Sequence, residues 1–179
     1  SLIILDKLIK SGYKICCCVT KPAAKIGRDQ VFIPTPVFEF AQKNHIPVIT
    51  PPSSQTNYLE FAQPEDLKKE LENFHPDILI TADYTQKIPQ NIVKNTPLSG
   101  INVHPSLLPQ YRGPAPVPWA IYNGETATGV SLITLAQKFD QGEIITQQKE
   151  KILATDTTEV LLTRLFEIGA ELLIKIFPA

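Results

Sequence analysis

The chain has 179 residues, of which 43% are hydrophobic and 20% charged, a composition typical of one ordinary folded domain or slightly more. Its formal net charge of −1 argues against binding nucleic acid through overall positive charge, so any RNA contact would come from a local patch. No apolar run reaches the ~18 residues of a membrane-spanning helix, and no basic segment with a long apolar stretch opens the chain, so neither a membrane span nor a signal peptide is predicted.

Apolar periodicity and turn residues predict helices that alternate with short buried strands. Helices are expected at Ser1–Lys10, Thr35–Asn44, Glu65–Phe74, Gln86–Val93 (with a turn), Pro116–Tyr122, and from the capping box Asp156-Thr157-Thr158-Glu159 to about Ile176. Strands are expected at Lys14–Thr20, Ile46–Thr50, Asp77–Ala82, Gly100–His104, Thr128–Leu135 and Glu143–Glu150. Loops are expected at Lys21–Thr35 and Pro51–Pro64.

The last two strands flank a short loop that contains Asp140 and Gly142, which predicts a β-hairpin with Gly142 in the turn. Before this hairpin, strands and helices alternate, which favours parallel strands with helices on both faces. The predicted fold class is therefore α/β: a doubly wound, Rossmann-like, mostly parallel sheet with a late antiparallel hairpin.

Three adjacent cysteines, Cys16, Cys17 and Cys18, fall in the first predicted strand. Neighbouring strand residues point to opposite faces, so the three thiols cannot all reach one metal ion or pair without strain. We interpret them as small buried hydrophobes in a reducing compartment, and we predict no metal site.

Two polar residues end the strand Gly100–His104. Asn102 and His104 lie two positions apart and therefore point to the same face, and Pro105 then ends regular pairing. An amide donor and an imidazole are thus expected side by side at the C-terminal end of a strand, where open α/β sheets bind ligands. Either residue alone is more often an ordinary turn residue, so the pair needs support from its surroundings.

That support comes from a longer motif. Asn102-Val103-His104 is followed by Ser106-Leu107-Leu108-Pro109-Gln110-Tyr111-Arg112-Gly113 and later by Asp140, a pattern that resembles the formyltransferases that use 10-formyltetrahydrofolate. The resemblance runs from Ser1 to about Ala170 and implies the formyltransferase fold. It is closest to the branch that formylates methionyl-tRNA, through Thr20-Lys21-Pro22 to Gly27-Arg28, Pro34-Thr35-Pro36-Val37, and Tyr111-Arg112-Gly113-Pro114-Ala115-Pro116.

The resemblance implies catalytic roles for Asn102, His104 and Asp140. Asn102 would donate an N–H to the oxyanion of a tetrahedral intermediate, and His104 would exchange protons with Asp140 as its partner. An aspartate before a glycine is also a common turn residue. Only the spacing of Asp140 from the Asn-x-His motif indicates catalysis. The family usually has Leu-Asp-Thr-Gly-Asp where this chain has Phe139-Asp140-Gln141-Gly142-Glu143.

The implied co-substrate is 10-formyltetrahydrofolate, without a metal. Its pterin ring is expected against the segment after Asp77–Ala82 and the loop before Asp140. The residues expected to bind folate are Tyr84, Gln86, Ile88, Ser106, Leu107, Pro109 and Phe139. Asp83-Tyr84-Thr85-Gln86 replaces the family's common Ala-Tyr-Gly-Gln, so Thr85 loses glycine's freedom for positive φ and Asp83 adds an unexpected carboxylate. Tyr84 could equally be an ordinary packing aromatic.

The segment Lys21–Gln30 matches a strongly basic loop that enters the tRNA acceptor stem in that branch. Lys25 and Arg28 are the predicted RNA-binding residues, although a solvated mobile loop is the alternative and Asp29-Gln30-Val31 replaces basic positions. The implied partners are methionyl-tRNA and folate, for a monomer in the bacterial cytoplasm or an organellar matrix, with no membrane contact.

The chain contains no methionine and opens directly on a helical pattern. We therefore expect residues 1–179 to be a formyltransferase catalytic domain without the family's first strand and C-terminal β-barrel. Two alternatives to methionyl-tRNA formylation stay open. One is a formyltransferase that acts on a nucleotide-linked amino sugar or glycinamide ribonucleotide. The other is a weakened homologue that binds folate or RNA without turnover.

Overall fold

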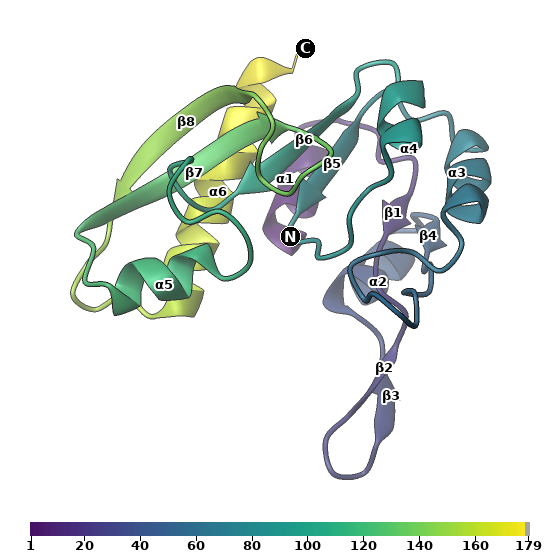
Figure 1. The fold of residues 1–179 in the computed structure, drawn as a ribbon, viewed down its shortest axis with the longest axis horizontal. Helices are drawn as coiled ribbons and strands as arrows, with labels where there is room; N and C mark the ends of the chain where they lie inside the picture. The colour runs from purple at the N-terminus through teal and green to yellow at the C-terminus, as the bar shows by residue number, and fades with distance from the viewer. Residues whose placement is uncertain (178–179) are drawn as a thin grey trace.

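A computed structural model describes residues 1–177 of the chain and has the α/β architecture (Figure 1). The helices are α1 (Leu2–Lys10), α2 (Pro36–Lys43), α3 (Pro64–Glu72), α4 (Gln90–Asn95), α5 (Pro116–Tyr122) and α6 (Thr158–Ile176). The strands are β1 (Cys18–Val19), β2 (Ala24–Ile26), β3 (Val31–Ile33), β4 (Val48–Ile49), β5 (Leu79–Ala82), β6 (Gly100–His104), β7 (Ala127–Thr134) and β8 (Ile144–Lys151). Every predicted helix and strand has a counterpart, although β1 and β4 are only 2 residues long each.

The strands β5, β6, β7 and β8 form one sheet in that order. Strands β5 and β6 run parallel, whereas β7 is antiparallel to β6, and β8 is antiparallel to β7. Strands β1 and β4 form a further parallel pair. Parallel strands with a late antiparallel addition are thus confirmed, and β6, which carries Asn102 and His104, lies between a parallel and an antiparallel neighbour.

Helices α1 and α6 cover one face of the sheet (Figure 1). Their apolar side chains share a core with Val103 of β6 and Leu132 of β7. Helix α6 approaches β6 closely at Gly169, where an added Cβ would lie 2.6 Å from Cγ1 of Val103. This contact sets the distance between β6 and α6. It therefore also sets the position of Asn102 and His104 on the other face of the strand.

A second core lies on the opposite face of β5. It joins Leu67 and Leu71 of α3 to Ile92 of α4, with Leu79 of β5 packed against it. Ile80 of β5 instead packs against the first core. Successive residues of β5 thus enter different cores, as a strand that is covered on both faces requires.

The segment 21–35, predicted to be a loop, contains an antiparallel hairpin of β2 and β3 that extends from the body of the molecule (Figure 1). The side chains of Val31, Phe32 and Ile33 in β3 are 56%, 65% and 43% exposed. With no buried face, the strand has no alternation of apolar and polar residues for a sequence pattern to detect. The loop prediction was therefore wrong for these strands.

The final helix starts one residue later than the predicted capping box requires. Thr157 is its N-cap and accepts a hydrogen bond from the N–H of Val160 at 3.3 Å, so Glu159 is only the second helical residue. Asp156 instead forms an ion pair of 2.6 Å with Arg164. Within residues 1–177, no helix combines the length and the apolar character needed to cross a membrane.

Candidate active site

Strand β6 carries Asn102 and His104 on one face, at its C-terminal end. Ile101 and Val103 are buried in the core on the other face. The strand ends at His104, and the chain then turns away at Pro105. The side-by-side placement predicted from the strand period is therefore present in the structure.

Asp140 reaches this pair from the loop between β7 and β8. Its Oδ1 accepts a hydrogen bond from Nδ2 of Asn102 at 3.0 Å and lies 3.4 Å from Nδ1 of His104. The side chains of His104 and Asp140 are only 6% and 7% exposed. Electrostatic interactions between them are therefore screened little by water. The three groups meet as the sequence motif predicts, and their catalytic roles stay a prediction.

The loop after β6 holds the Asp140 carboxylate from the other side. The N–H of Gly113 donates to Oδ2 at 2.8 Å, and Nε of Arg112 donates to the Asp140 carbonyl at 3.1 Å. Asp140 itself has φ 52, a left-handed conformation that aspartate tolerates better than most residues. Gly142, expected to serve the turn, is needed for space, because a Cβ there would collide with the Thr134 backbone.

The two ring nitrogens of His104 have different partners. Nε2 lies 2.9 Å from the carbonyl oxygen of Tyr111, which can only accept, so Nε2 carries a proton. Nδ1 faces the Asp140 carboxyl group, and that contact is attractive only when a proton lies on one of the two atoms. The arrangement therefore ties one nitrogen to the backbone and leaves Nδ1 as the atom that can share a proton with Asp140.

The carboxamide of Asn102 is bonded at both ends. The Thr81 hydroxyl donates to Oδ1 at 2.9 Å, while Nδ2 donates to Asp140. One of the two Nδ2 hydrogens remains for a ligand. Thr81 was not predicted as a site residue, because its contact with Asn102 depends on the pairing of β5 with β6.

Side chains from β7 and β8 hold the loop after β6 in place. Ser131 donates to the carbonyl of Ser106 at 2.6 Å, and Gln147 donates to the carbonyl of Leu108 at 2.9 Å. The Ser106 hydroxyl donates in turn to the carbonyl of Gln110 at 2.7 Å. Ser106, predicted to bind folate, is fully buried with its hydroxyl already bonded inside the loop. Gln147 also donates to the Ser131 hydroxyl at 2.8 Å. Ser131 and Gln147 were missed, because their contacts depend on how β7 and β8 lie against the loop after β6.

The remaining residues of the predicted folate site divide into two groups. Leu107, which is half-buried against Gly129, lies in the loop after β6, as does the exposed Pro109. Phe139, next to Asp140, is 42% exposed. These three residues belong to the two loops that meet at Asp140.

Tyr84, Gln86 and Ile88 pack against the second core. The Tyr84 hydroxyl donates to Oε1 of Gln86 at 2.9 Å, its ring stacks on Phe61 with centroids 6.4 Å apart, and burial raises its pKa. The buried Gln86 amide donates to Ser53 at 3.2 Å. The side chains of Tyr84 and Gln86 are thus bonded within the protein.

The expected problem at Thr85 does not arise. The positive φ in this turn falls on Asp83, at 56°, and not on Thr85. Asp83 is exposed, so its additional carboxylate faces solvent.

The predicted RNA-binding residues lie on the β2–β3 hairpin. Lys25 is in β2, with its ammonium 5.5 Å from the centre of the Phe32 ring, and Arg28 is in the exposed turn. The hairpin lies apart from β6, the strand that carries Asn102 and His104 (Figure 1).

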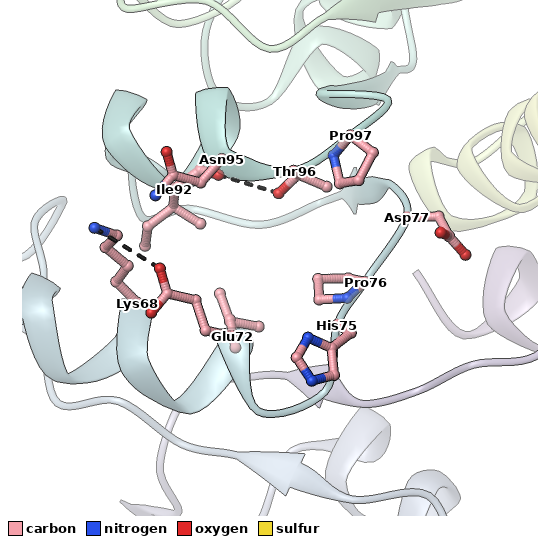
Figure 2. Close-up of a pocket in the computed structure, with 10 residues that line it drawn as sticks. Lys68, Glu72, His75, Pro76, Asp77, Ile92, Asn95, Thr96 and Pro97 are labelled. Carbon is pink, nitrogen blue, oxygen red and sulfur yellow. Dashed lines mark hydrogen bonds and ion pairs between the residues drawn. The ribbon is translucent and has the colours of Figure 1, made fainter.

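A surface cavity of about 400 Å³ lies at the other end of the sheet (Figure 2). Its lining residues include His75 and Asp77, which precede β5, and Thr96, which precedes β6. Asn102 and His104 lie in the C-terminal part of β6, so this cavity is not part of their site. Among residues 1–177, no cluster of three or more His, Cys, Asp or Glu side chains is arranged to hold a metal ion.

Comparison with known proteins assigns a family to this fold. Residues 2–177 match the family model described as formyl transferase. The chain is 35% identical over 179 residues to methionyl-tRNA formyltransferase of Lactobacillus acidophilus, and 38% identical over 178 residues to that of Bacillus cytotoxicus. These matches cover 100% and 99% of this chain but 54% of each relative, so the chain spans about half their length.

Solved structures share the fold at lower identity. A phosphoribosylglycinamide formyltransferase from Anaplasma phagocytophilum matches with a TM-score of 0.75 at 24% identity, covering 97% of this chain and 78% of that one. A formyltetrahydrofolate deformylase from Pseudomonas syringae matches with a TM-score of 0.74 at 17% identity, covering 98% and 58%. These structures are similar to this chain in fold, across different named activities.

Proposed function

The chain belongs to the formyl transferase family, and on that premise we propose that the protein transfers the formyl group of 10-formyltetrahydrofolate to the amino group of methionyl-tRNA. The observation that carries this proposal is the meeting of Asn102, His104 and Asp140 at the C-terminal end of β6. An uncharged donor, a proton-exchanging ring and a carboxylate are the groups that acyl transfer to an amine requires.

The reaction forms one C–N bond and breaks another. The amine nitrogen attacks the formyl carbon and loses a proton, and the folate nitrogen leaves with a proton. In between, the former carbonyl oxygen carries a negative charge. The free Nδ2 hydrogen of Asn102 would bind that oxygen, an interaction whose removal typically costs about 3 kcal/mol. Nδ1 of His104 and Asp140 would exchange the proton that moves from amine to leaving group.

The folate would lie along the two loops that meet at Asp140. Leu107, Pro109 and Phe139 are the predicted residues whose side chains remain open to it there. Ser106, Gln86 and Tyr84 are bonded within the protein, so we propose that their segments contribute to binding through the backbone and through loop shape.

The names of the relatives and the β2–β3 hairpin support methionyl-tRNA as the acceptor. A projecting hairpin with Lys25 and Arg28 offers cationic contacts to phosphates well away from the reacting groups. A small amine acceptor bound at Asn102 and His104 would not extend to this hairpin. The fold likeness to enzymes that act on phosphoribosylglycinamide lies below 25% identity and favours no acceptor.

The proposal is tested by supplying the purified protein with 10-formyltetrahydrofolate and one acceptor at a time. The acceptors are methionyl-tRNA, glycinamide ribonucleotide and a nucleotide-linked amino sugar, and both formylated product and released tetrahydrofolate are measured. We expect product with methionyl-tRNA alone, and roughly 100-fold slower product formation when Asn102→Ala replaces the wild type. Faster product formation with a small amine would overturn the acceptor, and folate binding without turnover of any acceptor would favour a weakened homologue.

A further inference from the structure

Thr81 is the polar residue of an otherwise apolar strand end. It lies in β5, directly opposite Asn102 in the parallel register of β5 and β6. Its neighbours Ile80 and Ala82 pack into the core on the other face, so Thr81 shares the face of Asn102. Its hydroxyl donates to Oδ1 of Asn102 at 2.9 Å.

A carboxamide needs this kind of constraint because its two ends have nearly the same shape. A half-turn about the last side-chain bond exchanges the donor Nδ2 for the acceptor Oδ1. Only Nδ2 can stabilise an oxyanion, and Oδ1 in the same place would repel it. The catalytic value of Asn102 therefore depends on which end faces the reacting carbon.

The two partners of the carboxamide contribute differently to that orientation. The Asp140 carboxylate can only accept, so it selects Nδ2 as the end that faces it, whereas the Thr81 hydroxyl holds the Oδ1 end and thereby fixes the plane of the amide. Asp140 accepts from Nδ2, but it also faces Nδ1 of His104 and lies where the proton is exchanged. A carboxyl group that gains a proton becomes a donor as well as an acceptor, so its hold on Nδ2 changes during the reaction. The hydroxyl of Thr81 does not titrate, and its bond to Oδ1 remains the same throughout.

We propose that Thr81 is a positioning residue for Asn102, whose hydroxyl keeps Nδ2 directed at the formyl oxygen while Asp140 and His104 exchange a proton. This proposal rests on the proposed formyl transfer. Thr81 does not touch the substrate in this scheme and acts only through the Asn102 amide. Its contribution therefore belongs to the transition state and not to folate binding.

The first test compares Thr81→Val, which keeps the shape of the side chain, with Thr81→Ser, which keeps the hydroxyl. We expect about a tenfold lower kcat for Thr81→Val, the loss of one hydrogen bond, with KM for 10-formyltetrahydrofolate unchanged. Thr81→Ser should recover most of the kcat. The matched control is Thr96→Val, which removes a buried threonine hydroxyl, bonded to Ile92, at the opposite end of the sheet. It should lower thermal stability without lowering kcat.

A double-mutant cycle separates positioning from general packing. In the Asn102→Ala background, Thr81→Val should lower kcat less than twofold further, because its target is gone. An equal loss in both backgrounds, or wild-type kcat in Thr81→Val alone, would overturn the proposal.

A second measurement does not depend on turnover. The side-chain amide ¹H–¹⁵N pair of Asn102 is identified in an NMR spectrum by its absence in Asn102→Ala. We expect Thr81→Val to move this pair and Thr81→Ser to leave it near its wild-type position. An unchanged pair in Thr81→Val overturns the positioning role even if the wild type transfers formyl groups. Absence of formyl transfer in the wild type would count against the proposed function. The NMR comparison would then still show whether Thr81 positions the Asn102 amide.

Discussion

Nε2 of His104 lies 2.9 Å from the backbone carbonyl of Tyr111, so the ring that faces Asp140 is oriented by the main chain of the loop that follows it. Tyr111 presents this carbonyl from a left-handed conformation with φ 54, and its hydroxyl donates to Glu125 at 2.7 Å. The imidazole is therefore fixed before any substrate arrives, and several consequences can be measured.

Removing either side chain of the Asn-x-His pair should affect the chemical step. Asn102→Ala and His104→Ala are each expected to lower turnover by roughly 100-fold, because each removes an interaction made in the transition state. Folate affinity, measured by fluorescence titration or calorimetry, should stay within about threefold of the wild type. A variant that keeps near-normal turnover would remove that residue from the proposed mechanism.

The β2–β3 hairpin can be tested through the salt dependence of KM for methionyl-tRNA. If Arg28 contacts a phosphate, Arg28→Ala should raise KM for methionyl-tRNA at low salt, and the difference from the wild type should narrow as salt rises. KM for 10-formyltetrahydrofolate should not change. Lys69→Ala, which removes an exposed positive charge from α3, is the matched control and should behave as the wild type. Equal effects of both substitutions would indicate a general charge effect in place of a hairpin contact.

Stability should depend strongly on one glycine. Gly169→Ala would place a methyl group 2.6 Å from Cγ1 of Val103, and the helix or β6 must shift to make room. We expect a loss of about 1–3 kcal/mol in the free energy of unfolding, measured by denaturant titration. Glu167→Ala, at an exposed position of the same helix, should change stability by less than about 0.5 kcal/mol. Similar values for the two variants would show that α6 is not in close contact with β6 at this point.

The acid side of the stability profile should report on Asp156. Its hydrogen bond to the Arg164 guanidinium holds the pKa of this carboxyl below its ordinary value. A lowered folded-state pKa gives stability that is fully present above the unfolded value of about 3.9 and is lost as pH falls through the folded value. Asp156→Asn should therefore lower Tm at pH 6, and its difference from the wild type should narrow as pH falls below about 3.9. Glu171→Gln, from an exposed pair with Lys7, should leave the profile unchanged.

The parts of the site that the sequence predicted are those that follow from local periodicity. The period of two in a strand was enough to place Asn102 and His104 together, and the motif register was enough to predict their meeting with Asp140. Thr81 was missed because its contact depends on how β5 and β6 pair, which no local pattern encodes. Packing was one of the two interpretations of Tyr84, and the structure shows its ring stacked on Phe61. The burial of Gln86 was missed, since it depends on Ser53 in a distant loop.

The fold was predictable wherever an element has one buried face. Helix α6 and strands β5 to β7 have such faces and were found close to their observed bounds. The residues of β3 are all exposed, and the hairpin segment was predicted to be a loop. Positive φ angles at Asp83 and Asp140 were not predicted either. From the sequence, such angles are expected at a glycine, such as Gly142, or at a residue that replaces one, such as Thr85.

The use of main-chain atoms at this site has a consequence for sequence variation. The carbonyls of Gln110 and Tyr111 accept the hydrogen bonds of Ser106 and His104, and the N–H of Gly113 binds Asp140. Every amino acid has a backbone carbonyl, so the exposed side chain of Gln110 can be replaced without removing the hydrogen bond from the Ser106 hydroxyl. A saturation library across residues 106–113 should therefore tolerate most substitutions at Gln110 and few at Ser106.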